Sequence, residues 1–315
     1  MSYSRRTFIK KSAVVVSSLP LMGMPYTLGQ EFMPADDLDV SIFSKHLQFL
    51  DYKETGQIAS ELGFNGVDLT VRPNGHVLPE DVVTKLPMAI QDIKASGSGC
   101  KMITTAIESV SHPLDVDIIK TAGKHGISFY RTNWYKYNTK WSMPESLEYY
   151  QKQVEALGYL NKEHNLVGCY QNHAGRKVGG SYWEIYKLLE TVNPNYFGTQ
   201  YDIRHALVEG GLSWENGFNL LQNSIKVIVL KDFKWGQENG VWKPINVPIG
   251  EGMVDFNKYF KLLKASGLNP PVSLHLEYPL GGAEKGNTTL TVDKKVVFDA
   301  MQKDLNTIRN LWKDA

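Results

Sequence analysis

Several side chains able to bind a metal ion or transfer a proton occur in pairs spaced two residues apart. His275 and Glu277 flank one leucine, and Gln171 and His173 flank one asparagine. Residues two apart on a β-strand share a face, so each pair should point into the same space. Asp202, in the run Asp-Ile-Arg-His, adds a second carboxylate. Carboxylates and imidazoles of this kind suit a divalent cation or proton transfer.

A metal ion would explain why two of these carboxylates converge. A buried Asp and Glu that face each other are costly unless positive charge lies between them. Carboxylate oxygens and imidazole nitrogens are suitable ligands for several divalent ions. We therefore predict one divalent ion, Mn²⁺, Co²⁺, Mg²⁺ or Zn²⁺, held by His173, Asp202, His275 and Glu277. For any single residue, the alternative is that it caps the core or forms a salt bridge with Arg72, Arg131 or Lys231.

The elements that must position these residues are short strands alternating with helices. Eight β-branched or aromatic runs are predicted as strands: 40–43, 66–71, 101–107, 127–132, 166–170, 196–201, 226–230 and 272–276. Three helix start signals and three glycines at helix ends mark the intervening helices: Asp51, Ser213 and Asp255, and Gly63, Gly126 and Gly267. Residues 289–313 form a last amphipathic helix.

This alternation predicts an α/β fold, a single-domain (β/α)₈ barrel with an all-parallel sheet. An open doubly wound sheet is the alternative, but no Gly-x-Gly-x-x-Gly motif follows any predicted strand. In a (β/α)₈ barrel the chemistry lies at the carboxyl ends of the strands. Further candidates for substrate contact therefore follow from their position at strand ends: Arg72, His76, Glu108, Arg131 and Gln171.

Composition narrows the classes of protein to which the chain can belong. Its 315 residues are 42% hydrophobic and 21% charged, which is typical of a packed globular protein. Thirty-four Lys and Arg against 33 Asp and Glu give a net charge of +1, so no broad basic face is expected for nucleic acid. The two cysteines match neither a zinc ribbon nor a disulfide scaffold, and no apolar run after the N-terminal region is long enough to span a bilayer.

The N-terminus has the pattern of an export signal. Ser-Arg-Arg-Thr-Phe-Ile-Lys at residues 4–10 precedes an apolar run at 13–21, which matches a twin-arginine signal. The alternative is a basic arm on a cytosolic protein. We expect residues 1–34 to be a signal peptide and linker, residues 35–315 to form the barrel, and the protein to be periplasmic. Such a location makes a phosphorylated sugar an improbable substrate, because sugar phosphates are cytosolic.

Over about residues 38–312 the chain resembles the xylose-isomerase-like barrels, the sugar (phosphate) isomerases and epimerases that share a fold with endonuclease IV. The matching pieces are Asp202-x-x-His205, Lys231-Asp232, the loop Pro248-Ile-Gly-Glu-Gly-Met-Val-Asp-Phe256 and Glu277. In that family a metal is held by a Glu, an Asp, a His and a Glu on strands five to eight. The resemblance implies that Asp202 and Glu277 are metal ligands and that His205 contacts the substrate.

Two positions depart from the family pattern. Gln171 stands where the strand-five Glu is expected, and Val229 stands where the strand-seven His is expected. We expect His173 and His275 to replace the missing ligands. Family epimerases use two opposed carboxylates, whereas this chain retains one, Glu277, as a proton-abstracting base. The departure therefore bears on mechanism as well as on metal binding.

Three functions remain open from the sequence. The first is a metal-dependent carbohydrate isomerase or epimerase acting on a neutral sugar or keto-sugar, with Glu277 as base and Lys231 stabilising a developing oxyanion. The second is a lyase or hydratase acting on 3-keto-glycosides with a single carboxylate base. The third is a non-catalytic sugar-binding barrel. The expected partner in each case is a small-molecule carbohydrate, and the sequence does not indicate an oligomeric state.

Overall fold

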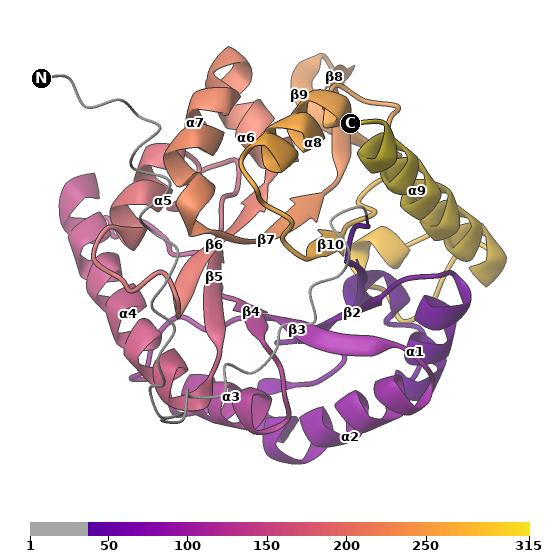
Figure 1. Cartoon of the computed structure of the whole chain (residues 1–315), viewed down its shortest axis with the longest axis horizontal. Coiled ribbons are helices and arrows are strands. Elements are labelled where there is room, and N and C mark those ends of the chain that lie inside the picture. The colour runs from indigo at the N-terminus through magenta and orange to yellow at the C-terminus, as the bar shows by residue number, and fades with distance from the viewer. Residues whose placement is uncertain (1–36) are drawn as a thin grey trace, which may run out of the picture. The chain divides into compact units, whose positions relative to one another are not determined.

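Eight parallel strands close into a barrel, as the alternating pattern predicts (Figure 1). The computed structural model describes residues 37–315. Around the barrel the strands follow the order β1-β10-β7-β6-β5-β4-β3-β2, so each neighbours the strand before it and β1 closes the ring against β10. The strands are β1 (Val40–Phe43), β2 (Gly66–Val71), β3 (Gly99–Thr105), β4 (Phe129–Arg131), β5 (Val167–Gln171), β6 (Phe197–Asp202), β7 (Ile225–Leu230) and β10 (Val272–Leu274).

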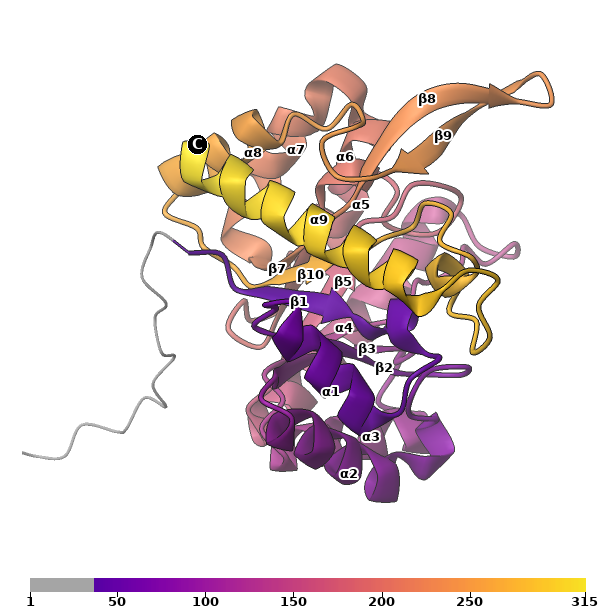
Figure 2. The same ribbon diagram turned by 90° about the vertical axis from the view of Figure 1, so that its right-hand side faces the viewer.

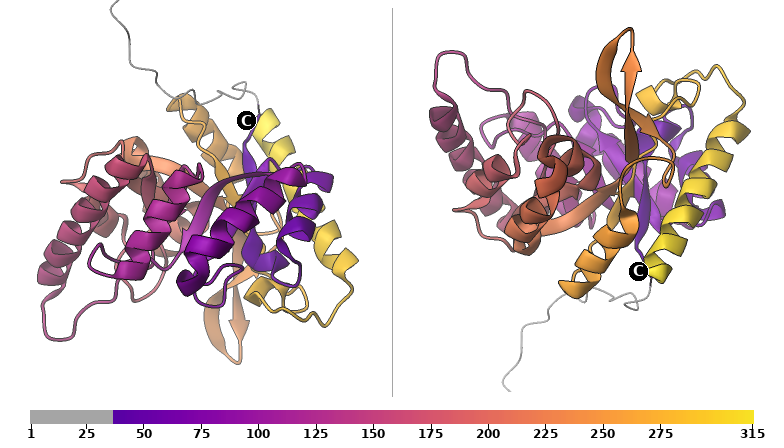
Figure 3. Two further views of the ribbon diagram at one scale, coloured as in Figure 1. Left: turned by 90° about the horizontal axis from the view of Figure 1, so that it is seen from below. Right: turned by 90° about the horizontal axis from the view of Figure 1, so that it is seen from above.

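Helices surround this barrel on its outer side (Figures 1 and 3). The α-helices are α1 (Tyr52–Glu61), α2 (Val82–Ala95), α3 (Pro113–Lys124), α4 (Met143–His164), α5 (Tyr182–Leu189), α6 (Ile203–Gly210), α7 (Trp214–Leu221), α8 (Phe256–Ala265) and α9 (Lys294–Asp314). Short 3-10 helices lie at Ser44–Leu47 (η1), Pro79–Asp81 (η2), Gly211–Ser213 (η3), Gln222–Ser224 (η4) and Ala283–Lys285 (η5). Within residues 37–315 no helix is long and apolar enough to cross a membrane.

Local sequence signals explain where several helices begin and end. Asp51 and Glu54 form a capping box at the start of α1, in which each side chain binds the other residue's backbone amide. Gly63, Gly126 and Gly267 adopt φ values of 89°, 79° and 67°, the left-handed conformation expected just after a helix. These glycines reverse the chain from the outer helices back into β2, β4 and β10.

The last helix completes the outer ring between α8 and α1 (Figure 1). Trp312 of α9 is buried and packs edge-on against Phe260 of α8, with ring centroids 5.3 Å apart. Asp304 of α9 accepts hydrogen bonds from the Ile249 amide (3.3 Å) and the Tyr278 hydroxyl (2.9 Å). The helix thereby fixes two segments that lead to and from the last barrel strand.

An antiparallel hairpin, which the sequence analysis missed, projects from the barrel after β7 (Figure 2). Its strands are β8 (Asp232–Glu238) and β9 (Val241–Val247), joined at Asn239 and Gly240. Both turn residues have positive φ, 53° and 78°, as a two-residue hairpin turn of type I′ requires. The Asn-Gly dipeptide between two strand-like runs was the available signal for this hairpin.

The extents of several predicted elements need correction. Strand 101–107 begins and ends earlier, at Gly99–Thr105, while strand 127–132 shortens to Phe129–Arg131. The last strand ends at Leu274, so His275 and Glu277 lie beyond the ladder. The helix expected at 289–313 begins at Lys294, where Asp293 accepts a hydrogen bond from the Lys295 amide. The twin-arginine stretch and the expected division at residues 1–34 lie outside the described residues.

Asp232 anchors the hairpin to the following loop. Its buried carboxylate accepts hydrogen bonds from four backbone amides: Phe233 (2.8 Å), Val254 (3.1 Å), Gly250 (3.0 Å) and Gly252 (3.0 Å). A Cβ at Gly252 would collide with this carboxylate, so the loop approaches it as closely as glycine allows.

Asp232→Asn should therefore destabilise the fold. The NH₂ group of an asparagine is a hydrogen-bond donor, so it would face backbone N–H groups that now donate to the carboxylate. We therefore expect a loss of about 2 to 4 kcal/mol of unfolding free energy. Chemical denaturation measures the loss. The matched control is Asp293→Asn, since asparagine caps a helix as well as aspartate does and stability should hardly change. Equal stability of the two variants would contradict the anchoring role of Asp232.

Candidate active site at the barrel mouth

A cavity of about 110 Å³ opens at the carboxyl ends of the barrel strands. It is lined by Phe43, Lys45, Arg72, Arg131, Trp134, Gln171, His173, Lys231, His275 and Glu277. A larger cavity of about 170 Å³ lies beside α5 and α6, where Glu209 is the one ionisable carboxylate and already binds the Gly175 amide at 2.7 Å. Cationic, anionic and imidazole groups meet in the mouth cavity, which is therefore the candidate active site.

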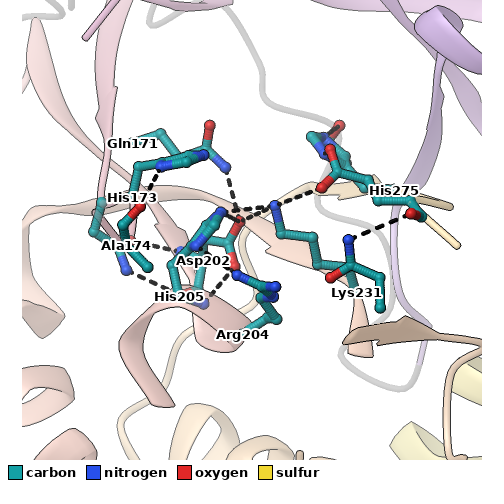
Figure 4. Close-up of polar contacts among 12 residues, drawn as sticks. Gln171, His173, Ala174, Asp202, Arg204, His205, Lys231 and His275 are labelled. Atoms are coloured by element: carbon teal, nitrogen blue, oxygen red, sulfur yellow. Dashed lines mark hydrogen bonds and ion pairs between the residues drawn. The ribbon is translucent and has the colours of Figure 1, made fainter. Parts of the chain in front are cut away.

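Lys231, the residue after β7, lies at the centre of this site (Figure 4). Its ammonium Nζ is 3.1 Å from Asp202 Oδ2, 3.4 Å from Glu277 Oε2 and 2.9 Å from His205 Nε2. The side chain is 3% exposed, so these contacts replace most of its hydration. The salt bridge that the sequence analysis gave as an alternative role of Lys231 is thus present, with two carboxylates at once.

Asp202 ends β6 and also begins α6. Its Oδ1 accepts the His205 amide at 3.0 Å as a helix N-cap, and its Oδ2 accepts Gln171 Nε2 at 2.8 Å. The side chain of Asn172 binds the Asp202 backbone through two hydrogen bonds. Its Nδ2 donates to the carbonyl at 2.9 Å, and its Oδ1 accepts from the amide at 2.7 Å. Burial raises the pKa of Asp202, while the Lys231 charge and the His205 amide oppose that rise.

Glu277 forms the opposite side of the Lys231 contact and is half-buried. Its Oε1 is 3.1 Å from Lys45 Nζ and 3.8 Å from His275 Nδ1. Burial raises the pKa of Glu277, but Lys231, the nearby His275 and Lys45 outweigh it and hold the pKa well below its usual range. Glu277 is therefore ionised at neutral pH and shares its charge between two lysines.

The histidines of the mouth are uncharged at neutral pH. Burial lowers the pKa of His173 to about 4 and that of His275 to about 3. Burial, followed by the charge of Lys231, also lowers the pKa of His205, whose Nδ1 lies 3.1 Å from Arg204 Nη1. His173 stacks at a tilt on His205, with centroids 3.9 Å apart. Neutral imidazoles can accept hydrogen bonds or protons in this setting.

A divalent ion was predicted between these groups, and the arrangement does not fit one. Among residues 37–315 no three His, Cys, Asp or Glu side chains are grouped to hold a metal ion. The ammonium of Lys231 fills the place between Asp202 and Glu277. His173 Nδ1 is 2.8 Å from the Ala174 carbonyl, and His275 Nε2 is 3.1 Å from Ser273 Oγ. One ring nitrogen of each predicted imidazole ligand is thus engaged by a neighbour, whereas the buried Nδ1 of His275 has no hydrogen-bond partner among residues 37–315.

Val229, which stands where the family pattern has a histidine on strand seven, lies two residues before Lys231. Val229 is buried and pairs with Asp202 across the β6–β7 ladder. Lys231 follows two residues later, so both side chains lie on the same face of the chain. Where the family pattern places a neutral ligand, this chain has an aliphatic side chain with a cation directly above it.

The other predicted site residues divide into two groups. Arg72, Arg131 and Gln171 line the cavity. His76 does not line it; its Nδ1 lies 3.1 Å from Ser44 Oγ. Glu108 is exposed and accepts a hydrogen bond from Asn133 Nδ2 at 2.6 Å. The structure does not bring these two residues to the cavity.

The sequence analysis missed Lys45. It lies in η1, two residues after the end of β1, and reaches Glu277 across the β1–β10 junction. The signal was available, because the rule that selects polar residues at strand ends also selects the stretch Phe43-Ser-Lys45. Phe43 belongs to the same wall, where its ring stacks on His275 with centroids 4.2 Å apart.

Lys231→Met tests the central contact. It leaves the buried Asp202 carboxylate without a cation, and we expect a loss of about 3 to 5 kcal/mol of unfolding free energy. Lys231→Met combined with Asp202→Asn removes the charge as well and should recover most of that loss. Denaturant unfolding of the four corners of this cycle measures the coupling. Lys187→Met, at an exposed ion pair on α5, is the control and should change little. Additive losses in the double variant would show that the pair is not coupled.

Comparison with solved structures finds the same fold in several proteins of low sequence identity. A xylose isomerase-like TIM barrel protein from Mycobacterium smegmatis, in complex with magnesium, is 11% identical with a TM-score of 0.65, covering 89% of this chain and 100% of that chain. The probable 3-DHS dehydratase AsbF from Bacillus anthracis is 16% identical (TM-score 0.63, 85% and 99% covered). The 3-keto-D-glucoside 4-epimerase YcjR from E. coli is 11% identical (TM-score 0.60, 86% and 100% covered).

These likenesses establish the fold and nothing more specific. No curated protein matches the sequence significantly. The family model for the xylose isomerase-like TIM barrel, however, matches residues 57–291, which is most of the chain and nearly all of the barrel. On this match the chain belongs to the xylose isomerase-like TIM barrel family.

Proposed function

We propose that the protein is an enzyme that isomerises or epimerises an unphosphorylated carbohydrate by moving a proton next to a carbonyl group. The observation that supports it is the group of Lys231, Glu277 and Lys45 at the edge of an open cavity, which places a carboxylate base between two cations. Proton abstraction next to a carbonyl creates an enediolate, and fixed positive charge stabilises it.

The residues of the cavity have distinct roles in this proposal. Glu277 accepts the proton. Lys231 is placed to hydrogen-bond the carbonyl oxygen as it gains negative charge, and the substrate's entry displaces one of its present contacts. Because Glu277 is a weak base, the reaction depends on these cations to acidify the substrate C–H. Trp134 and Phe43 offer aromatic faces to the apolar side of a sugar ring.

One carboxylate on one face is sufficient for an isomerase. Glu277 can remove and return a proton on the same side of an enediolate. His173 belongs to the β5 wall, on the other side of Lys231 from His275 (Figure 4). Its burial-lowered pKa of about 4 keeps it unprotonated, so it can serve as a second proton acceptor for an epimerase. No step of this scheme requires a metal ion, and none is assigned to one.

A lyase acting on a 3-keto-glycoside is the second candidate. Glu277 is the single carboxylate that lines the cavity within the described residues, since Gln171 takes the second position. A single base can also remove the proton next to a ketone and expel a leaving group from the adjacent carbon. The solved structures of similar fold include both classes, a 3-keto-D-glucoside 4-epimerase and a probable 3-DHS dehydratase. We further propose, from the twin-arginine stretch alone, that the enzyme works in the periplasm.

Solvent exchange distinguishes these functions. The protein is incubated in D₂O with ketoses, aldoses and 3-keto-glycosides, and products are followed by mass spectrometry. Deuterium gained at unchanged composition indicates an isomerase or epimerase, whereas a released aglycone indicates a lyase. Glu277→Gln should lower either activity by about 10² to 10⁴-fold. Glu190→Gln, at an exposed ion pair on α5, is the matched control. Full exchange by Glu277→Gln would overturn the assignment of the base.

The pH dependence gives a separate test. Ionised Glu277 is the active form, and its pKa lies well below 4.5, so activity should not fall as the pH decreases from neutrality to about 4.5. Lys45→Met removes one cation that stabilises the carboxylate, which raises the pKa of Glu277 and should move the acidic limb of the rate profile to higher pH. Lys295→Met, on the outer surface of α9, should leave the limb in place. An unmoved limb in Lys45→Met would show that Glu277 does not control the rate.

A further inference from the structure

The mouth cavity has more positive than negative charge. Its lining includes four cationic side chains, Lys45, Arg72, Arg131 and Lys231, and one carboxylate, Glu277. Two buried carboxylates lie close behind the lining, Asp202 and Asp68. A buried cation, Arg204, also lies behind the lining, so cations outnumber anions even with both of these carboxylates ionised. The lysines are paired with Glu277 and Asp202, so the excess charge lies on the arginines.

Arg131, at the end of β4, is buried with neutral partners only. It is 4% exposed; Nη1 donates to Gln171 Oε1 at 3.2 Å and Nη2 to the Thr105 carbonyl at 3.3 Å. Its Nε has no partner among residues 37–315, and no carboxylate there forms an ion pair with it. The guanidinium rests 4.1 Å from the Trp134 ring centre. Burial, and next the charge of Arg72, lowers the pKa of Arg131 to about 9.

Arg72, after β2, is the second guanidinium. Its Cζ lies 5.5 Å from the centre of the Phe43 ring, and within the described residues it forms no ion pair. Asp68 and Glu277 are the anions that act on both arginines. Asp68 accepts its hydrogen bonds from Thr104 (3.0 Å) and Ser273 (2.6 Å), and Glu277 is paired with lysines. Two guanidinium groups therefore face one small cavity, and no carboxylate among residues 37–315 is in contact with either.

We propose that this cavity binds a carboxylate-bearing sugar, a sugar acid, with its carboxylate held by Arg131 and Arg72. The inference rests on the proposed function, because it names the substrate class for the same site. Guanidinium groups bind carboxylates through paired hydrogen bonds, and the open Nε of Arg131 supplies a buried donor. Sugar phosphates are cytosolic, so the proposed periplasmic location favours a carboxylate over a phosphate as the bound anion. The sugar acid replaces the neutral sugar expected from the sequence.

This placement separates binding from chemistry. Arg131 ends β4, which lies across the ring from β10 and three strands from β7, the strands that Glu277 and Lys231 follow. Arg72 follows β2, which is separated from β10 by β1 alone. A sugar whose carboxylate binds the arginines spans the cavity and brings a distant carbon toward Lys231 and Glu277. Trp134, stacked on Arg131, provides a fluorophore at the binding end.

The test measures binding by calorimetry and by tryptophan fluorescence. The probes are D-glucuronate, D-galacturonate and D-gluconate, with D-glucose, D-galactose and glucose 6-phosphate for comparison. We expect at least one acid to bind about tenfold or more tightly than its neutral counterpart. Arg72→Gln should abolish this preference and lower affinity for the acid about tenfold, while keeping the affinity for the neutral sugar. Arg131→Lys retains the positive charge but not the forked guanidinium group, so it should also weaken binding of the sugar acid.

The control is Arg176→Gln, which removes an exposed arginine from the loop after β5 and should leave the preference intact. Equal affinity for acid and neutral sugar, tighter binding of glucose 6-phosphate, or no binding of any acid would each overturn the proposal. A failure of the proposed function gives a different result: a sugar acid binds through Arg72, but it gains no deuterium from D₂O. Exchange on a neutral sugar that is insensitive to Arg72→Gln would retain the function and remove the sugar-acid inference.

Discussion

The ammonium group of Lys231 is the interaction on which the barrel mouth depends. It is the cation that lets a fully buried Asp202 and a half-buried Glu277 approach each other, and each of these carboxylates organises a different wall. Asp202 orders the β5–β6 side through Gln171, while Glu277 orders the junction of β10 and η1 through Lys45. A covalently attached cation has one property that a bound ion lacks: it cannot dissociate from the protein.

This interaction also determines the chemistry available to the neighbouring groups. The charge of Lys231 contributes to the lowered pKa of His173, His205 and His275, and it is the largest of the influences that lower that of Glu277. The site therefore combines cationic side chains with neutral imidazoles and one ionised carboxylate. Such a set polarises a carbonyl group strongly and accepts protons weakly, which favours substrates whose C–H bond is already acidified by a ketone.

Adjacent residues at the end of β7 perform unrelated tasks because their side chains point to opposite sides. Lys231 turns into the cavity, while Asp232 turns outward and binds four backbone amides of the hairpin and its following loop. The anchoring of Asp232 limits the movement of the chain at Lys231. The stability of the hairpin and the position of the central cation are thus linked through one peptide bond.

The sequence by itself determined the barrel and most of the side chains at its mouth. Alternation of apolar runs, helix caps such as Asp51 and helix-ending glycines such as Gly63 act locally, so they can be read along the chain. Strand-end position likewise brought Arg131, Gln171, Lys231 and Glu277 to one cavity. The Asn239–Gly240 hairpin was equally local and was overlooked.

Only the tertiary structure decided what those side chains contact. Whether Asp202 and Glu277 face an ion or an ammonium depends on the distance between β6, β7 and β10 and on the reach of one lysine, and the sequence fixes neither. The same holds for Lys45, which meets Glu277 only because the barrel closes β1 against β10, 232 residues away along the chain. The charge of a site is a sum over residues distant in sequence, and that sum exists only once the barrel has closed.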